Sequence, residues 1–387
     1  MKNYRQNFFS FWKNNKKVIG FIFLVFFVWQ VIITALSLIH PSFLPIKKTF
    51  MYQGVDDDLK FLWNRANFDG VHYLHIARFG YGLRQQAFFP AYPQLIRKVT
   101  PLFGGNDLLA AVFISNISLL LGLFFLYKIV CLDCGEEVAR WAIFLLLLFP
   151  TSFFFGGVYT ESLFLMLVVA SFYAARRRCW WLAGLLGGLA SYTQLVGIFL
   201  LPALVWEWWS WQDKKSLKNK FLSLIPLSLT PVGLLVYMNF LWEKYQDPLL
   251  FFHVQPYFGA ERSGGKIILL YQVFWRYFKM ALTTKLDFLY FTVWLEILVA
   301  ISFLILLYLA FRKKIRTSYL IFGIISYLIP TLTGTFSSMP RYVLALFPCF
   351  IYLGAIKNKL LYYSLALIFS FLLILCSIFF YQGYWIA

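Results

Sequence analysis

Residues 18–39 read VIGFIFLVFFVWQVIITALSLI, a run of 22 residues without a charged side chain. A helix of about 20 apolar residues is long enough to cross the hydrocarbon core of a bilayer. Lys13, Lys16 and Lys17 precede the run, and no convincing small-residue cleavage site follows it. We therefore interpret it as a retained membrane anchor and not as a removed signal peptide.

The rest of the chain continues this apolar pattern. Of the 387 residues, 61% are hydrophobic, 21% are aromatic and only 13% are charged. A soluble domain of this length would need more polar surface, and no polar stretch is long enough to be a linker. The composition predicts one all-α polytopic membrane domain over residues 1–387.

The apolar runs predict about eleven transmembrane helices, within a range of nine to thirteen. They lie near residues 18–39, 107–130, 138–157, 160–175, 179–193, 196–211, 221–243, 288–311, 318–336, 341–356 and 360–380. The runs at 179–193 and 196–211 are short for full crossings, so we expect a bent or re-entrant pair.

Several clusters of Lys and Arg fall in short loops. Such loops resist translocation, so their positions predict the orientation of the protein in the membrane. A cytoplasmic N-terminus places the clusters at 176–178, 213–220, 312–316 and 357–359 inside. Two long loops, 40–106 and 244–287, are then external. We expect an integral protein of the plasma membrane or endoplasmic reticulum. The formal charge of +19 follows largely from this placement and does not indicate a nucleic-acid partner.

The first external loop contains the segment Trp63–Pro93, WNRANFDGVHYLHIARFGYGLRQQAFFPAYP. Its apolar spacing predicts a short amphipathic helix after Asn67, with Asp69 near the start. Asp69 is our candidate catalytic residue. A helix N-cap that stabilises by about 1 kcal/mol is an alternative interpretation, and the two roles are compatible.

Two imidazoles follow Asp69 on nearly the same helical face, His72 and His75. Three ligands at this spacing drift around a helix, and no other Cys/His cluster completes a coordination shell. We therefore expect no metal and no cofactor. The imidazoles are candidates to bind a sugar or phosphate, and the alternative is that they line the membrane edge.

Four blocks of sequence resemble one family. The run FDGVHYLHIARFGY (68–81) followed by AFFPAYP (87–93) is similar to the N-terminal signature of the PIG-V-like mannosyltransferases, within the GT-C superfamily of polytopic glycosyltransferases. Further blocks resemble that family in the same order, at LFPTSFFFGGVYTESLF (148–164), QDPLLFFHVQPYFG (246–259) and PRYVLALFP (340–348).

The resemblance implies a GT-C-like fold and an extracytoplasmic transferase. Such an enzyme moves a hexose, typically mannose, from a polyprenyl- or dolichyl-phosphate-linked donor, with an acidic residue of the first external loop as general base. Asp69 matches that residue. The chain departs from the family pattern at Phe68, where Trp is usual, and at Asn67, where Arg is common. It also has Thr193-Gln194 where the family often has Thr-Arg. These departures leave the donor and acceptor specificity open.

The residues fit this chemistry independently. A carboxylate within about 3 Å of the acceptor hydroxyl takes its proton as the hydroxyl attacks the anomeric carbon. The leaving group is already a phosphate, so one carboxylate suffices and the sugar carbon is inverted, unlike the two-carboxylate hydrolases.

The donor phosphate needs a cation at the membrane edge, and Arg341 is the first candidate; the alternative is an arginine that snorkels to lipid headgroups. Glu161 has a supporting role or is an exposed acid at a helix start. The remaining candidates for substrate binding or support are Tyr73, Tyr159, Gln255 and Tyr257.

A transporter or flippase of lipid-linked sugars is the rival function, and a structural membrane protein is a third. Paired broken helices in an internal repeat would favour transport, and we find no clear repeat. The expected partners are the lipid-linked donor, a lipid or polymer acceptor and membrane lipids. The residues leave open which hydroxyl is the acceptor and whether the hexose is mannose.

Overall fold

Helices make up the regular secondary structure of the described residues, which contain no strand. The computed structural model describes residues 2–39, 41, 44–53, 59–211, 222 and 224–386. The α-helices are α1 (Lys2–Ser37), α2 (Lys60–Trp63), α3 (Asp69–Phe79), α4 (Ala91–Val99), α5 (Asp107–Cys134), α6 (Glu136–Leu148), α7 (Glu161–Arg176), α8 (Trp180–Thr193), α9 (Leu200–Trp209), α11 (Val232–Tyr245), α12 (Leu250–His253), α13 (Leu270–Thr283), α14 (Phe288–Arg312), α15 (Thr317–Thr331), α16 (Met339–Tyr342), α17 (Phe347–Gly354) and α18 (Lys359–Tyr381). Short 3-10 helices are η1 (Lys48–Phe50), η3 (Asn64–Ala66), η4 (Gln85–Ala87), η5 (Thr100–Phe103), η6 (Ser152–Gly156), η7 (Leu195–Phe199), η8 (Ile225–Leu229), η9 (Gln255–Phe258) and η10 (Val343–Ala345). The prediction of an all-α chain is confirmed.

Five helical segments of the described chain are long and apolar enough to cross a membrane, judged by length and composition. They are Asn15–Ser37, Asp107–Cys134, Ile225–Tyr245, Phe288–Arg312 and Lys359–Tyr381. Shorter apolar helices cover Leu195–Trp209 and Thr317–Thr331. The count of eleven spans stays a prediction, and the basic loop at 213–220 lies outside the described residues.

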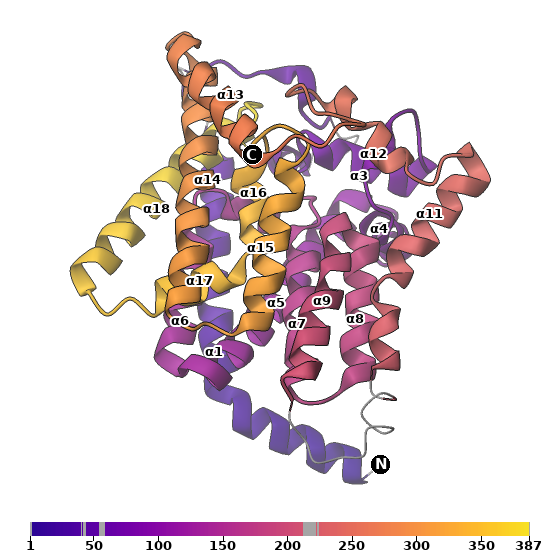
Figure 1. The fold of residues 1–387 in the computed structure, drawn as a ribbon, viewed down its shortest axis with the longest axis vertical. Coiled ribbons are helices and arrows are strands. Elements are labelled where there is room, and N and C mark those ends of the chain that lie inside the picture. Colours follow the sequence, from indigo (N-terminus) through magenta and orange to yellow (C-terminus); the bar gives the residue numbers. More distant parts are fainter. Residues whose placement is uncertain are drawn as a thin grey trace.

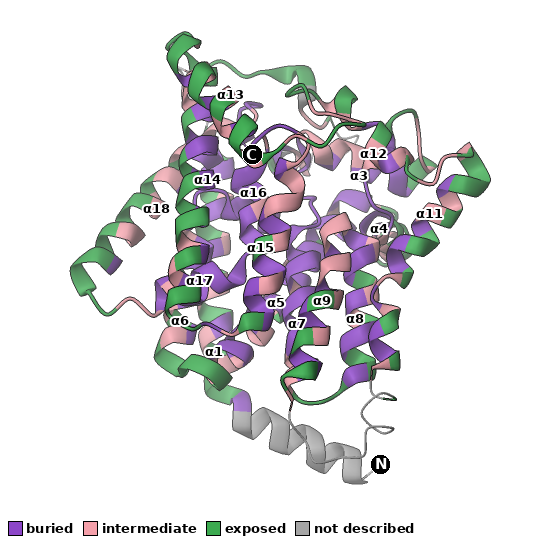
Figure 2. Cartoon of the chain, in the orientation of Figure 1, coloured by how far each residue is buried: buried purple, intermediate pink, exposed green. Residues whose placement is uncertain are grey.

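Helix α7 occupies the centre of the bundle (Figures 1 and 2). Almost all of its residues from Glu161 to Ala175 are buried, and it packs against α5 on one side and α8 on the other. A helix that is apolar around its whole circumference is stable only when protein or lipid surrounds it. Here protein surrounds it, so both ends of α7 are fixed in place by its neighbours.

Helix α8 uses small residues to approach η8 and α11 closely. A Cβ atom built on Gly184 would lie 1.9 Å from the carbonyl oxygen of Pro226. One built on Gly188 would lie 2.6 Å from the carbonyl oxygen of Leu229. The GxxxG pair is therefore a packing motif, as is common for such pairs in membrane helices.

Proline residues break two of the predicted apolar runs. Helix α6 ends at Leu148, and Phe149, which precedes Pro150, has φ −57° and ψ 141°, outside the helical region, because a following proline disfavours that region. The run at 341–356 is divided into α16, η10 and α17. These breaks place irregular backbone near Tyr159 and around Arg341, at the same end of the bundle.

The two long loops carry short helices. Loop 40–106 contains α2, α3 and α4, and loop 244–287 contains α12, η9 and α13. Figure 1 shows them at the end of the bundle where α16 lies. Helix α13 was not predicted; it buries Val273, Tyr277 and Ala281, and exposes Tyr271, Trp275, Phe278 and Leu282. That exposed apolar face is typical of a helix in a membrane interface.

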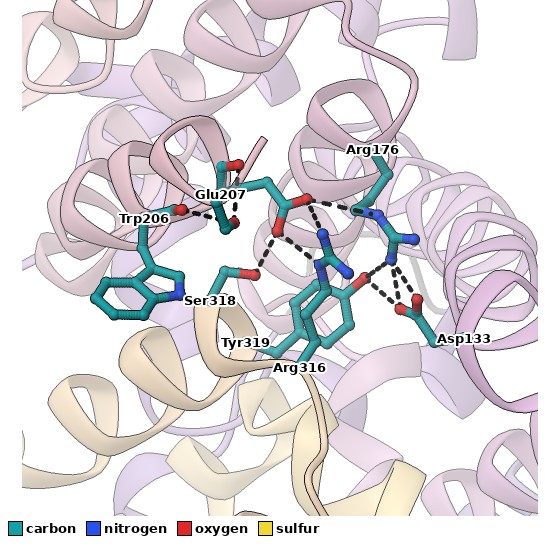
Figure 3. Close-up of polar contacts among 8 residues, drawn as sticks. Asp133, Arg176, Trp206, Glu207, Arg316, Ser318 and Tyr319 are labelled. Carbon is teal, nitrogen blue, oxygen red and sulfur yellow. Dashed lines mark hydrogen bonds and ion pairs between the residues drawn. The ribbon is translucent and has the colours of Figure 1, made fainter. Parts of the chain in front are cut away.

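The opposite end of the bundle is held by a polar network (Figure 3). Glu207 on α9 is 5% exposed and accepts hydrogen bonds from Arg316 Nε at 2.7 Å and Nη2 at 2.6 Å. Arg176 at the end of α7 donates to Asp133 on α5 at 2.6 Å and lies 3.5 Å from Glu207. Tyr319 on α15 also donates to Asp133, at 2.8 Å. The network thus ties α5, α7, α9 and α15 together.

Candidate active site

Helix α3 presents Asp69 at its first turn. The preceding residue, Phe68, has φ 58° and ψ −116°, a conformation that costs a non-glycine residue roughly 1–3 kcal/mol. The helix ends at Gly80, with φ 85°, and Arg97 of α4 donates hydrogen bonds to the carbonyls of Ala77 and Ile76. The C-terminal end of α3 is therefore fixed by specific contacts with α4.

Asp69 does not cap its own helix. The N-cap position belongs to Phe68 and carries no side-chain cap hydrogen bond. The Asp69 carboxylate instead accepts a hydrogen bond from Nη1 of Arg341 at 2.6 Å, across 272 positions of sequence. The N-cap interpretation is wrong, because Asp69 is the first residue of the helix and the residue before it, Phe68, is at the N-cap position.

Arg341 joins two carboxylates. Its Nε atom lies 3.3 Å from Oε1 of Glu161, so the guanidinium lies between Asp69 and Glu161. The Arg341 and Glu161 side chains are 9% and 8% exposed, whereas Asp69 is 19% exposed. The chain therefore brings together three of the predicted site residues, and Asp69 is the most accessible of them.

Aromatic rings surround the Arg341 guanidinium. Its Cζ atom lies 5.4 to 5.6 Å from the centroids of four rings, which belong to Phe154, Tyr159, Tyr342 and Trp385. Aromatic faces attract a guanidinium, and they exclude the water that would weaken its ion pairs. The charge of Arg341 therefore acts strongly on the two carboxylates.

Each charged group keeps an atom for a further partner. Oε2 of Glu161 is buried and has no hydrogen-bond partner among the described residues. Nε of Arg341 is also buried without a hydrogen-bond partner in the described chain, although it lies 3.3 Å from Oε1 of Glu161. In their shared hydrogen bond Asp69 uses Oδ2 and Arg341 uses Nη1, which leaves Oδ1 and Nη2 without a hydrogen bond to another described residue. A buried, unpartnered carboxylate oxygen is costly, and a substrate hydroxyl would satisfy it.

Two predicted tyrosines support this site. Tyr159 donates a hydrogen bond to the carbonyl oxygen of Asn67 at 2.7 Å and thereby holds the chain that leads into Asp69. Tyr73 is buried, and this burial, followed by the charges of Glu161 and Asp69, raises the pKa of its phenol well above the ordinary value. Tyr73 is thus a neutral hydrogen-bond donor beside the carboxylates.

The imidazoles lie to one side of the carboxylates. His72 stacks on Phe88, with ring centroids 4.9 Å apart, and its Nδ1 atom is 3.2 Å from Nε2 of Gln85. Burial lowers the pKa of His72, although the charge of Asp69 opposes the shift. Nδ1 of His75 is buried without a hydrogen-bond partner in the described chain. No group of three or more His, Cys, Asp or Glu side chains with metal-binding geometry occurs among the residues described.

Gln255 and Tyr257 do not join the carboxylates. Gln255 donates to the carbonyl oxygen of Phe251 at 3.1 Å, within its own loop. Tyr257 is 59% exposed and lies under the Arg84 guanidinium at 3.8 Å. Their neighbour Phe258 instead reaches the site, with its ring 5.9 Å from His72.

Several residues at this site were not predicted from the sequence. They are Phe154, Tyr342 and Trp385 around Arg341, and Gln85, Phe88 and Phe258 around His72. Phe154 and Tyr342 lie within the quoted motifs and were available as candidates. Trp385 follows α18 in a short aromatic segment, which has no pattern that distinguishes it from a membrane-edge anchor.

Solved structures resemble the chain in fold. The crystal structure of ArnT from Cupriavidus metallidurans bound to undecaprenyl phosphate matches with a TM-score of 0.53 at 14% identity, over 92% of this chain and 62% of ArnT. Its apo state matches with a TM-score of 0.49 at 16% identity, over 89% and 61% of the two chains. Archaeoglobus fulgidus AglB, in complex with an inhibitory peptide and a dolichol-phosphate, gives 0.47 at 14% identity, over 94% and 56%. The chain thus spans less than two thirds of these neighbours.

The helical architecture and the match to ArnT define the class: this integral membrane protein has the fold of the GT-C glycosyltransferases. Residues 18–228 match the family described as Mannosyltransferase (PIG-V), and this match covers more than half of the chain. The chain belongs to the PIG-V mannosyltransferase family, as its four sequence blocks predicted. No curated protein sequence matches it.

Proposed function

We propose that the protein transfers a hexose, mannose, from a polyprenyl-phosphate donor to an acceptor hydroxyl on the extracytoplasmic side of a membrane. One observation carries the proposal. Asp69 is a partly exposed carboxylate that a buried arginine orients, and its Oδ1 atom forms no hydrogen bond within the described chain. Family membership supports the choice of mannose, and ArnT, whose structure contains undecaprenyl phosphate, supports a lipid-linked donor.

Asp69 acts as the general base in this proposal. Oδ1 accepts the proton of the acceptor hydroxyl while the hydroxyl oxygen bonds to the anomeric carbon and the bond to the lipid phosphate breaks. Arg341 holds Oδ2 and so fixes the direction of Oδ1. Because attack and departure occur on opposite faces of the sugar, the product has inverted configuration.

Arg341 and Glu161 bind the substrates in this proposal. Nη2 of Arg341 hydrogen-bonds the phosphate oxygen on which negative charge develops, and a phosphate leaving group requires no general acid. Oε2 of Glu161 accepts a hydrogen bond from a sugar hydroxyl, which satisfies a buried atom that is otherwise unpartnered.

The positions of two arginines support the proposed orientation of the protein in the membrane. Arg176 and Arg316 come from two basic clusters far apart in sequence, and both lie in the network around Glu207 (Figure 3). Arg176 ends α7, and Glu161 at the start of α7 pairs with Arg341, so the network lies at the end of the bundle away from Asp69. Basic residues of short loops stay on the cytoplasmic side. Asp69 and the helices of loops 40–106 and 244–287 are then extracytoplasmic.

The test uses the full chain purified in detergent. Radiolabelled polyprenyl-phosphate-mannose is added with a total lipid extract, and the corresponding glucose donor serves as a control for sugar specificity. We expect labelled mannose to be transferred from the lipid phosphate to an acceptor. The configuration at the anomeric carbon of the mannose should be inverted in the product. Retained configuration would contradict the single-base mechanism. Movement of the intact donor across vesicles without transfer would instead identify a flippase.

A further inference from the structure

Phe68, the residue before Asp69, has a backbone conformation that a phenylalanine rarely adopts. Phe68 has a φ of 58°, although it is a bulky residue with a Cβ atom. Such a conformation persists only where surrounding structure holds it. Because Asp69 follows directly, whatever holds Phe68 also sets the direction of the Asp69 side chain.

Two aromatic contacts of Phe68 come from the other end of the sequence. Its ring lies 4.9 Å from the ring of Trp385, edge to face, and 5.6 Å from the ring of Phe380. The side-chain amide of Asn67 donates to the carbonyl oxygen of Phe380 at 3.2 Å. The end of α18 and the segment that follows it therefore clamp both residues before Asp69.

Trp385 also contacts the partner of Asp69. Its ring centroid is 5.6 Å from Cζ of Arg341, so one side chain touches both the backbone support of Asp69 and the guanidinium that binds its carboxylate. Aromatic pairs in edge-to-face geometry are attractive and directional. Trp385 is therefore suited to fix the angle between Asp69 and Arg341.

The segment 382–386 is itself anchored to the first long loop. The backbone amide of Lys47 donates to the carbonyl oxygen of Gln382 at 2.9 Å, and the Tyr384 hydroxyl donates to the carbonyl oxygen of Pro45 at 3.0 Å. Ile386 is fully buried. These contacts give Trp385 a defined position relative to α3.

We infer that Trp385, with Phe380, is a positioning residue for catalysis: it maintains the unfavourable backbone angle of Phe68 and thereby aims the Asp69 carboxylate at the acceptor hydroxyl. This role rests on the proposed transferase function. It does not require contact between Trp385 and substrate. The substrate affected is the one on which Asp69 acts, an acceptor alcohol that attacks a sugar phosphate.

The test compares kcat and KM for sugar transfer in four forms of the full chain: wild type, Trp385→Leu, Trp385→Phe and the control Trp275→Leu. Trp275 is an exposed tryptophan on α13, 58% accessible. A small misplacement of a catalytic group costs on the order of 100-fold in rate, so we expect kcat of Trp385→Leu to fall about 10- to 100-fold with KM for the donor within about twofold. Trp385→Phe restores most of kcat, and Trp275→Leu resembles wild type.

A second substitution separates positioning from general packing. Glycine adopts a positive φ without support, so in a Phe68→Gly background the Trp385→Leu substitution should lower kcat by less than about threefold further. An equal loss in both backgrounds, or a change confined to KM, would overturn the positioning role. If Trp385→Leu does not fold, Phe380→Leu replaces it in both backgrounds with the same criterion.

Different results would overturn the transferase function and the positioning role of Trp385. A folded wild type that transfers no sugar overturns the proposed function and this inference with it. An active wild type whose kcat is unchanged in Trp385→Leu overturns the inference alone.

Discussion

Arg341 is the residue on which the charge balance of the site depends. It lies between Asp69 at 2.6 Å and Glu161 at 3.3 Å, inside a group of aromatic rings. Two carboxylates this close are tolerated because the guanidinium separates them and neutralises one charge. The pattern of residues identified Arg341 as a cation at the membrane edge; its pairing with Asp69 and Glu161 required the structure.

Replacing Arg341 with methionine should therefore destabilise the protein. Removal of one partner of a buried ion pair costs about 3–5 kcal/mol, because the remaining charges lose their counter-ion. We expect a lower midpoint of thermal unfolding in detergent for Arg341→Met. A second substitution, Glu161→Gln, removes one of the two stranded charges and should recover part of the loss. Equal midpoints for the single and double variants would contradict this pairing.

His72 should make the stability depend on pH. Burial lowers its pKa in the folded protein below the ordinary value of 6.5, so the unfolded chain binds the proton first as the pH falls. The free energy of unfolding then decreases from about pH 6.5 downward, by at most about 1.4 kcal/mol per pH unit, and is unaffected above that range. Thermal unfolding between pH 5 and 8 measures this. His72→Gln should show a shallower slope, and an identical slope would argue against a buried neutral imidazole.

At the scale of elements, the network around Glu207 fixes the helices far from the site. Glu207 is 5% exposed and also accepts a hydrogen bond from Ser318 at 2.8 Å. Its arginine partners belong to α7 and to the turn before α15. Because α7 also carries Glu161 at its other end, the network helps to set the position of that carboxylate along the bundle axis.

Glu207→Gln should lower stability without altering substrate binding. Arg316 is 34% exposed, so solvent screens part of the loss, and we expect about 1–3 kcal/mol. The matched control is Glu136→Gln, since Glu136 forms an exposed ion pair with Arg140 and should change stability by less than about 0.5 kcal/mol. Thermal unfolding and KM for the donor are measured for both. A raised KM in Glu207→Gln at full stability would contradict a purely structural network.

At the scale of the whole molecule, local patterns predicted the fold better than the site. Apolar length and helical spacing are encoded within single segments, so the all-α class and α3 followed from sequence. Helix α13 was missed because its apolar residues are interleaved with polar ones in a loop, and the apolar-run criterion does not detect such a helix. The breaks near Pro150 and Pro348 also depend on which backbone groups find partners elsewhere.

The site itself joins distant segments, which sequence spacing cannot reveal. Asp69, Glu161 and Arg341 were identified singly, from residue type and family motif, and the structure brings them within one group of contacts. Gln255 and Tyr257 were chosen by the same reasoning and lie elsewhere, because their loop turns Phe258 toward His72 instead. Trp385 reaches the site only through the packing of α18 and the residues that follow it.

The most direct test of the account is single-turnover transfer from polyprenyl-phosphate-mannose by wild type and Asp69→Asn. Asparagine keeps the size of Asp69 and can still accept a hydrogen bond from Arg341, but it cannot take a proton. We expect the rate to fall by at least about 100-fold while donor binding and the unfolding midpoint remain close to wild type. Transfer by Asp69→Asn at the wild-type rate would contradict the account.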